Sequence, residues 1–193
     1  MKKSAIFVPL FVLLLIINCS VVPSVKMSED ISKKVLRLHI LANSDSEYDQ
    51  SLKLKVRDDI LDYSKKLFRD CTSLDEAINI AENNTASICK RAQKTLNNCY
   101  NVRVTVTDEY YNTRKYDGFT LPAGVYKSIR IIIGEGRGHN WWCVMFPSVC
   151  LSGCTDDLGQ TLSEKELEMI EDKNYIIKFK IVEIYEKIKD NIS

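Results

Sequence analysis

One segment gathers the densest set of side chains that could do chemistry in this chain. It runs from Gly134 to Cys143 and reads GEGRGHNWWC. The thiol of Cys143 could act as a nucleophile with His139 or His39 as its base, and the same side chains are of the type that binds zinc. Two adjacent tryptophans instead offer a surface on which a protein partner can bury large rings.

The spacing of these residues favours binding over catalysis. No third residue stands out that would orient a histidine toward Cys143. Neither His139 with Cys143 nor Cys150 with Cys154 has the CxxC spacing typical of a zinc site. The alternating glycines are not followed by a helical pattern, so they are not a dinucleotide-binding fingerprint. We therefore expect no catalytic residue, no metal and no cofactor. A thiol- or metal-dependent hydrolase acting on protein or cell wall remains the alternative.

The first 25 residues predict that the chain enters a membrane. Lys2 and Lys3 precede a stretch without charge from Ser4 to Val25, which is most apolar over residues 5–17. The apolar part is as short as in a cleavable signal peptide, whereas the whole stretch approaches the roughly 20 residues that span a membrane. Residues 1–25 are expected to be a signal peptide or an N-terminal anchor. Because the lysines come first, residues 26–193 are expected to lie outside the cytoplasm.

Charge and cysteine content fit an exported domain whose partner is a protein. The chain has 27 basic and 26 acidic residues, so its charge gives no reason to expect nucleic acid or an anionic membrane surface as a partner. Export favours disulfides, although free buried thiols remain the alternative. The disulfide candidates, by closeness in the sequence, are Cys143, Cys150 and Cys154, followed by Cys89 with Cys99.

The hydrophobic pattern predicts the elements that must position the GEGRGHNWWC segment. Strands are expected over residues 35–41, 102–107, 126–133 and 141–146, and residues 109–116 either continue the second strand or form another. Capping boxes at Ser46 and Ser73 begin a long helical hairpin over residues 46–97, and two helices follow Ser163. This order predicts a single two-layer α+β domain with a mixed sheet of about four to five strands.

Two details of the predicted strands bear on the candidate residues. Alternation places Trp141 and Trp142 on opposite faces of their strand, so one ring is expected in the core and the other is available to a partner. His39 lies within the first strand, where a structural histidine is expected. Asp45 and Asp49 follow that strand and are interpreted as acids at the start of a helix.

Three segments resemble the stage II sporulation protein R family. They are LRLHILANSDS over residues 36–46 with the start of the helix that follows, LPAG-x-Y over residues 121–126, and GEG-x-GHNWWCV-x-FP over residues 134–147. The resemblance covers about residues 35–154 in the same order. The last forty residues match only loosely, as helices.

The resemblance implies an exported developmental signal rather than an enzyme. Members of the family are made in the forespore and exported into the space between the forespore and mother-cell membranes. There they activate a membrane-embedded aspartic-type protease of the mother cell, which processes the precursor of the mother-cell sigma factor (pro-sigma-E). We expect that protease as the partner. The residues expected to contact it are Glu135, His139, Asn140, Trp141 and Trp142, with His39, Asn43 and Asp45 beside them.

Overall fold

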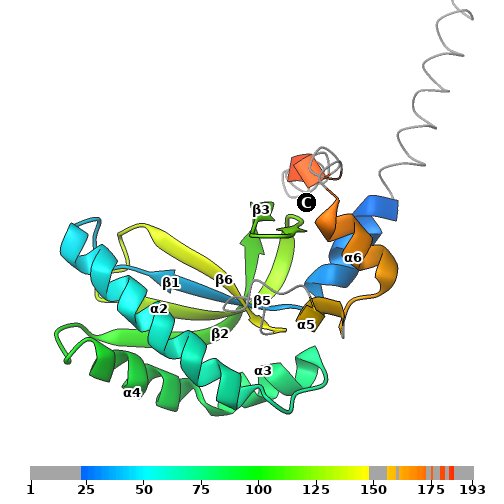
Figure 1. Cartoon of the computed structure of the whole chain (residues 1–193). Coiled ribbons are helices and arrows are strands. Elements are labelled where there is room, and N and C mark those ends of the chain that lie inside the picture. The colour runs from blue at the N-terminus through cyan, green and yellow to red at the C-terminus, as the bar shows by residue number, and fades with distance from the viewer. Residues whose placement is uncertain are drawn as a thin grey trace, which may run out of the picture.

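The computed structural model describes residues 23–147, 156–159 and 161–172, together with Tyr175, Phe179, Lys180, Glu183 and Ile184. These residues form a mixed sheet with three helices along one face and further helices at one end (Figure 1). Residues 1–22 of the predicted signal peptide or anchor, Cys150, Cys154 and most of the predicted terminal helix lie outside the described residues. None of the described helices is long and apolar enough to cross a membrane.

Four strands form the main sheet, in the spatial order β2-β5-β1-β6. The central strand β1 (Leu36–Leu41) runs parallel to β5 (Gly124–Ile133) and antiparallel to β6 (Asn140–Phe146). The edge strand β2 (Val102–Tyr111) runs antiparallel to β5. The short strands β3 (Arg114–Lys115) and β4 (Thr120–Leu121) form a separate sheet, so the segment 109–116 is divided between β2 and β3. The predicted α+β class with a mixed sheet is confirmed.

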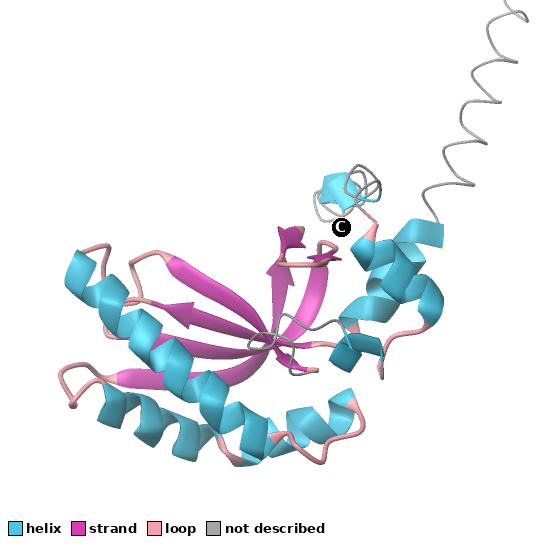
Figure 2. Cartoon of the chain, in the orientation of Figure 1, coloured by secondary structure: helices cyan, strands magenta, loops and turns pink. Residues whose placement is uncertain are grey.

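The predicted helical hairpin is present as three helices. They are α2 (Glu47–Leu67), α3 (Leu74–Asn83) and α4 (Thr85–Thr95), and they lie along one face of the sheet (Figure 2). The Oγ atoms of Ser46 and Ser73 accept the N–H groups of Asp49 and Glu76, so both serines are N-caps as expected. The reciprocal bond of a capping box is not made at either site, because Ser46 N–H donates to Ser44 and the Glu76 carboxylate accepts from Thr72. The second helix is interrupted at Asn84, whose side chain donates to the carbonyl of Ile80 and so competes with the main-chain ladder.

The sheet is buried on one face along its whole length and on the other face only at one end. Alternate residues of β1, namely Leu36, Leu38 and Ile40, pack under α2–α4. A second core lies on the opposite face, where the helical segment over residues 23–32, α5 (Asp156–Gly159) and α6 (Glu164–Glu171) gather at one end of the sheet (Figure 2). β1 is therefore buried on both faces, whereas its alternation predicts a half-buried strand.

Candidate functional site

Two loops lie against each other at the end of the sheet where β1 and β5 stop. The first, residues 42–46, joins β1 to α2, and the second, residues 134–139, joins β5 to β6; we call the pair the tip. The N–H of Gly138 donates to the carbonyl of Ala42 at 3.0 Å. The side chain of Asn43 bridges the loops, because its Oδ1 accepts the N–H of Glu135 at 3.0 Å and its Nδ2 donates to Asp49 at 2.8 Å.

The glycines of the second loop allow this close contact. At Gly134 the backbone has a φ of +56°, and a Cβ there would collide with the side chain of Asn43. At Gly138 a Cβ would collide with the main-chain carbonyl of Ser44. The predicted unusual backbone path therefore serves to bring the two loops together, and only glycine fits at these two positions.

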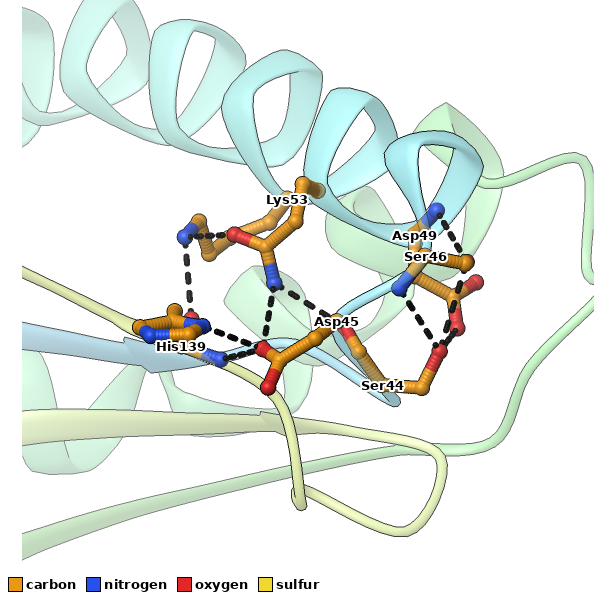
Figure 3. A network of polar contacts seen from close by, with 7 residues as sticks. Ser44, Asp45, Ser46, Asp49, Lys53 and His139 are labelled. Atoms are coloured by element: carbon orange, nitrogen blue, oxygen red, sulfur yellow. Dashed lines mark hydrogen bonds and ion pairs between the residues drawn. The ribbon is translucent and has the colours of Figure 1, made fainter.

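Asp45 and His139 form an exposed contact across the tip (Figure 3). Asp45 Oδ1 lies 2.5 Å from both the main-chain N and the ring Nδ1 of His139. The hydrogen bond from the His139 main chain is the largest cause that holds the pKa of Asp45 below its usual value. The Nζ of Lys53, on α2, donates to the carbonyl of His139 at 2.9 Å. The two side chains are fixed in position while they stay open to solvent, at 80% exposure for His139 and 55% for Asp45.

Asp49 anchors the tip to the first turn of α2. Its carboxylate is buried and accepts hydrogen bonds from Ser44 Oγ at 2.5 Å, Asn43 Nδ2 at 2.8 Å and the hydroxyl of Tyr100 at 2.8 Å. These hydrogen bonds, the one from Ser44 first, hold the pKa of Asp49 below its usual value. The sequence pattern identifies Asp49 only as an acid at a helix start, because nothing in the pattern links it to Tyr100.

The two tryptophans of β6 lie on opposite faces of the sheet, as predicted. Trp141 packs against the core under α2–α4, with the guanidinium of Arg57 4.3 Å from its ring centre. Trp142 lies on the other face, where its ring stacks on His39 at 5.3 Å between centroids and the guanidinium of Arg114 lies 3.8 Å from its centre. Both rings are half-buried, and each packs against a core, Trp141 against the one under α2–α4 and Trp142 against the second core. The two rings therefore do not share a surface, and burial alone does not single out one of them as the ring that a partner meets.

His39 is a buried histidine held by a carboxylate. Its Nδ1 lies 3.0 Å from Oε1 of Glu109, and the same carboxylate pairs with Arg130 at 3.3 Å. Burial by itself raises the pKa of Glu109, but the hydrogen bonds from His39 and Ser128 and the charges around it outweigh burial, so the pKa lies below its usual value. Glu109, Arg114 and Arg130 escape sequence analysis because only the pairing of strands brings them to His39 and Trp142.

A buried cation, the guanidinium of Arg37, lies next to the pair formed by His39 and Glu109. Arg37 is two residues before His39 on the same face of β1 and is fully buried. Its guanidinium lies 3.9 Å from the ring centre of Tyr111 and 4.9 Å from that of Tyr126, and it donates to the hydroxyl of Tyr116. Burial raises the pKa of both Tyr111 and Tyr126, so both hydroxyls stay neutral beside the cation. Arg37 and these tyrosines lie in the second core, on the same face of the sheet as His39.

The other predicted contact residues lie close to the tip. Glu135 is exposed within the second loop and pairs with Arg137 at 3.2 Å. Asn140 begins β6 and is paired in register with Leu41. The structure thus brings Asn43, Asp45, Glu135, His139 and Asn140 to one end of the sheet, and places His39 and Trp142 on the face beside it.

Cys143 is not placed as a nucleophile. Its side chain is buried on the α2–α4 side of the sheet, and it is bonded in a disulfide whose partner lies outside the described residues. His39 lies on the opposite face, and His139 is on the exposed tip. The thiol and base pair of the hydrolase alternative is therefore not assembled. Within the described residues, no group of three or more His, Cys, Asp or Glu side chains could hold a metal ion.

The predicted pairing of Cys89 with Cys99 is wrong in this structure, because both thiols are free. Cys89 lies on α4 and donates its S–H to the carbonyl of Val102 at 3.2 Å, facing the edge of the sheet. Cys99 is exposed in the turn that follows the helix. Closeness in the sequence does not bring the two sulfurs together, because the helix and the turn direct them differently.

Comparison with known proteins identifies the family. The family described as Stage II sporulation protein R (spore_II_R) matches residues 32–156, which include β1, all of the helices α2–α4, the tip and β6. A protein named Stage II sporulation protein R from Bacillus subtilis (strain 168) is 34% identical over 139 residues, which cover 70% of this chain and 61% of that relative. The similarity thus spans about three fifths of the relative's length. No solved structure matches the chain. The chain belongs to the stage II sporulation protein R family and has a role in sporulation.

Proposed function

We propose that this protein is a signal exported from the forespore, which activates the membrane-embedded aspartic-type protease that processes pro-sigma-E in the mother cell. The observation that carries the proposal is the family match over residues 32–156. The cationic start and the stretch without charge up to Val25 support export into the intermembrane space. Residues 26–193 are then the signalling domain, which is either secreted or held by its N-terminal segment.

A binding signal needs a surface rather than a reaction centre. A ligand shifts an equilibrium between two states of a receptor only by the difference in its affinity for them. A tenfold shift requires about 1.4 kcal/mol, and one tryptophan buried on a partner contributes about 2 kcal/mol or more. The half-buried Trp142 and the exposed side chains of Asp45 and His139 supply such a surface on rigid elements.

The placement of Cys143 supports a signal that is not an enzyme. A hydrolase that used this thiol would need a free sulfur with a base beside it. Cys143 is buried, disulfide-bonded and on the face opposite His39. The exported thiol- or metal-dependent hydrolase therefore has no observation in its favour among the described residues.

The test is reconstitution in a bacterium that does not sporulate. The membrane protease and pro-sigma-E are produced together with the full chain, and cleavage of pro-sigma-E is followed by immunoblot. Cleavage is expected with the full chain, and with an unrelated signal peptide in place of residues 1–25, but not when those residues are deleted. A Cys143→Ser variant separates binding from catalysis, because a folded variant that abolishes cleavage would argue for the enzyme.

A further inference from the structure

We propose that the uncovered half of the sheet face opposite α2–α4 docks an extended acidic segment of the protein partner, an inference that rests on the proposed function. We call this surface the open face. It is made of six residues from β1, β2, β3, β5 and β6: His39, Arg103, Thr105, Arg114, Arg130 and Trp142.

Strand register places four of these residues in one row. Thr105 of β2 is paired with Arg130 of β5, Arg130 with His39 of β1, and His39 with Trp142 of β6. Paired residues point to the same face of a sheet, so the row crosses all four strands. Arg103 lies two residues before Thr105 and therefore also points to this face. The row spans about 14 Å at the usual spacing of strands, the length of about four extended residues.

The open face is accessible except at His39, which is buried. Arg103 and Thr105 are exposed, Trp142 and Arg114 are half-buried, and the Arg130 side chain is 38% exposed. The second core adjoins the row, because Trp142 itself packs against that core. A partner can reach the row without displacing any core side chain.

The charge of the open face identifies the partner's chemistry. Three arginines, Arg103, Arg114 and Arg130, belong to the open face, and the carboxylate of Glu109 is already paired with His39 and Arg130. This local excess of positive charge stands out in a chain whose net charge is only +1. Charge complementarity therefore favours an acidic partner. Nucleic acid is a poor fit, because its affinity comes mainly from many cationic contacts to phosphates, and the chain as a whole is nearly neutral.

Trp142 and His39 supply the centre of the surface. The ring of Trp142 is held between His39 and Arg114 before any partner arrives, so little side-chain freedom remains to be lost on binding. Nε2 of His39 is buried and has no hydrogen-bond partner within the described residues, although its Nδ1 is satisfied by Glu109. Because this nitrogen is buried, His39 contributes to the surface by stacking on the ring of Trp142 rather than by contacting a partner itself.

The direct test measures binding of synthetic peptides to the full chain by fluorescence anisotropy. The probe is a labelled peptide of alternating glutamate and valine, and its controls are the matching lysine–valine peptide, a single-stranded RNA and vesicles that contain an anionic lipid. The open-face variant is Arg103→Glu, Arg114→Glu. The matched variant is Lys55→Glu, Lys90→Glu, which changes the net charge equally at exposed positions of α2 and α4 on the other side of the molecule.

The acidic peptide is expected to bind the native chain and the matched variant with dissociation constants that agree within twofold. It should bind the open-face variant at least tenfold more weakly. Its affinity for the native chain should fall as the salt concentration rises. Absence of binding to the native chain, or an equal loss in both variants, would overturn the docking surface. Tighter binding of RNA or vesicles than of the acidic peptide would overturn the occupant.

Cleavage of pro-sigma-E by the same variants separates this inference from the proposed function. If the native chain activates the protease and the open-face variant activates it equally, the docking surface is wrong and the proposed function stands. If the native chain does not activate the protease but the acidic peptide still discriminates between the variants, the proposed function is wrong and the docking surface stands.

Discussion

The α-carbon of Gly138 lies so close to the main-chain carbonyl of Ser44 that no side chain fits between them. The contact joins two loops that are far apart in the sequence, and it brings the N–H of Gly138 to 3.0 Å from the carbonyl of Ala42. The same approach sets His139 beside Asp45. The arrangement of the exposed tip therefore depends on a position with no side chain.

Gly138→Ala is expected to lower the free energy of unfolding by about 1–3 kcal/mol, because its Cβ would push the main chain of Ser44 away. The matched control is Gly124→Ala, since the nearest atom to a Cβ there is 3.7 Å away, an ordinary contact. Urea unfolding of the two variants checks this prediction. If the two variants have the same free energy of unfolding, the two loops can move apart without loss of stability, and the prediction is wrong.

Asp49→Asn is expected to destabilise the fold in a way that depends on pH. The carboxylate accepts hydrogen bonds from Asn43, Ser44 and Tyr100, and hydrogen bonds to a charged group contribute about 1.5–3 kcal/mol. The pKa of Asp49 is lower in the folded chain than in the unfolded chain, so this stabilisation is present above about pH 4 and is lost as the pH falls through the folded pKa. The difference between native chain and variant should therefore shrink in acid.

Thermal unfolding between pH 7 and pH 2 measures that difference. Asp58→Asn is the matched control, because Asp58 is an exposed residue of the same helix and, in the part of the chain that the structure describes, pairs only with the neighbouring Arg57. A loss of stability that is the same for both variants, or that does not change with pH, would contradict the role of Asp49.

The oxidation state of the cysteines gives a third prediction. Thiol labelling of the native protein should modify Cys99 before Cys89, since Cys99 is exposed and the thiol of Cys89 donates to the carbonyl of Val102.

Peptide mapping without reduction should find Cys143 in a disulfide, and Cys150 and Cys154 are the partners we expect. Cys143→Ser should lower stability by about 2–4 kcal/mol and leave activation of the protease intact at permissive temperature. Labelling of Cys143 in the native protein would refute the disulfide.

Local patterns predicted most of the elements. Alternation in β1, β2 and β6 and the caps at Ser46 and Ser73 are local signals, and each element lies within a few residues of its expected position. The break at Asn84 was missed because apolar spacing continues across it, while the competing hydrogen bond to Ile80 is made by a single side chain.

The candidate site was only partly predictable, because it depends on pairing across strands. The glycines, His139 and the acids after β1 stand out in the sequence, but their joining into one tip follows from contacts between residues far apart in the chain. Arg114, Arg130 and Glu109 have no distinguishing spacing, and they reach Trp142 and His39 only through the order β2-β5-β1-β6 and the turn to β3. The alternation of β1 places Arg37 on the face away from Leu36 and Leu38, where a charged side chain is expected to meet solvent. In the structure the rings of Tyr111, Tyr116 and Tyr126 surround its guanidinium instead.

The two adjacent tryptophans are expected to differ in their effect on activation when each is replaced by alanine. Trp141 packs on the core under α2–α4, so Trp141→Ala should lower the free energy of unfolding by about 2 kcal/mol or more. Trp142 packs against the second core and belongs to the open face, so Trp142→Ala should also lose some stability, but the folded variant should activate the protease at least tenfold less well at equal concentration. Near-ultraviolet circular dichroism and urea unfolding report the fold, and cleavage of pro-sigma-E reports the signal. If folded Trp142→Ala activates the protease at the native concentration, the contact surface does not include Trp142.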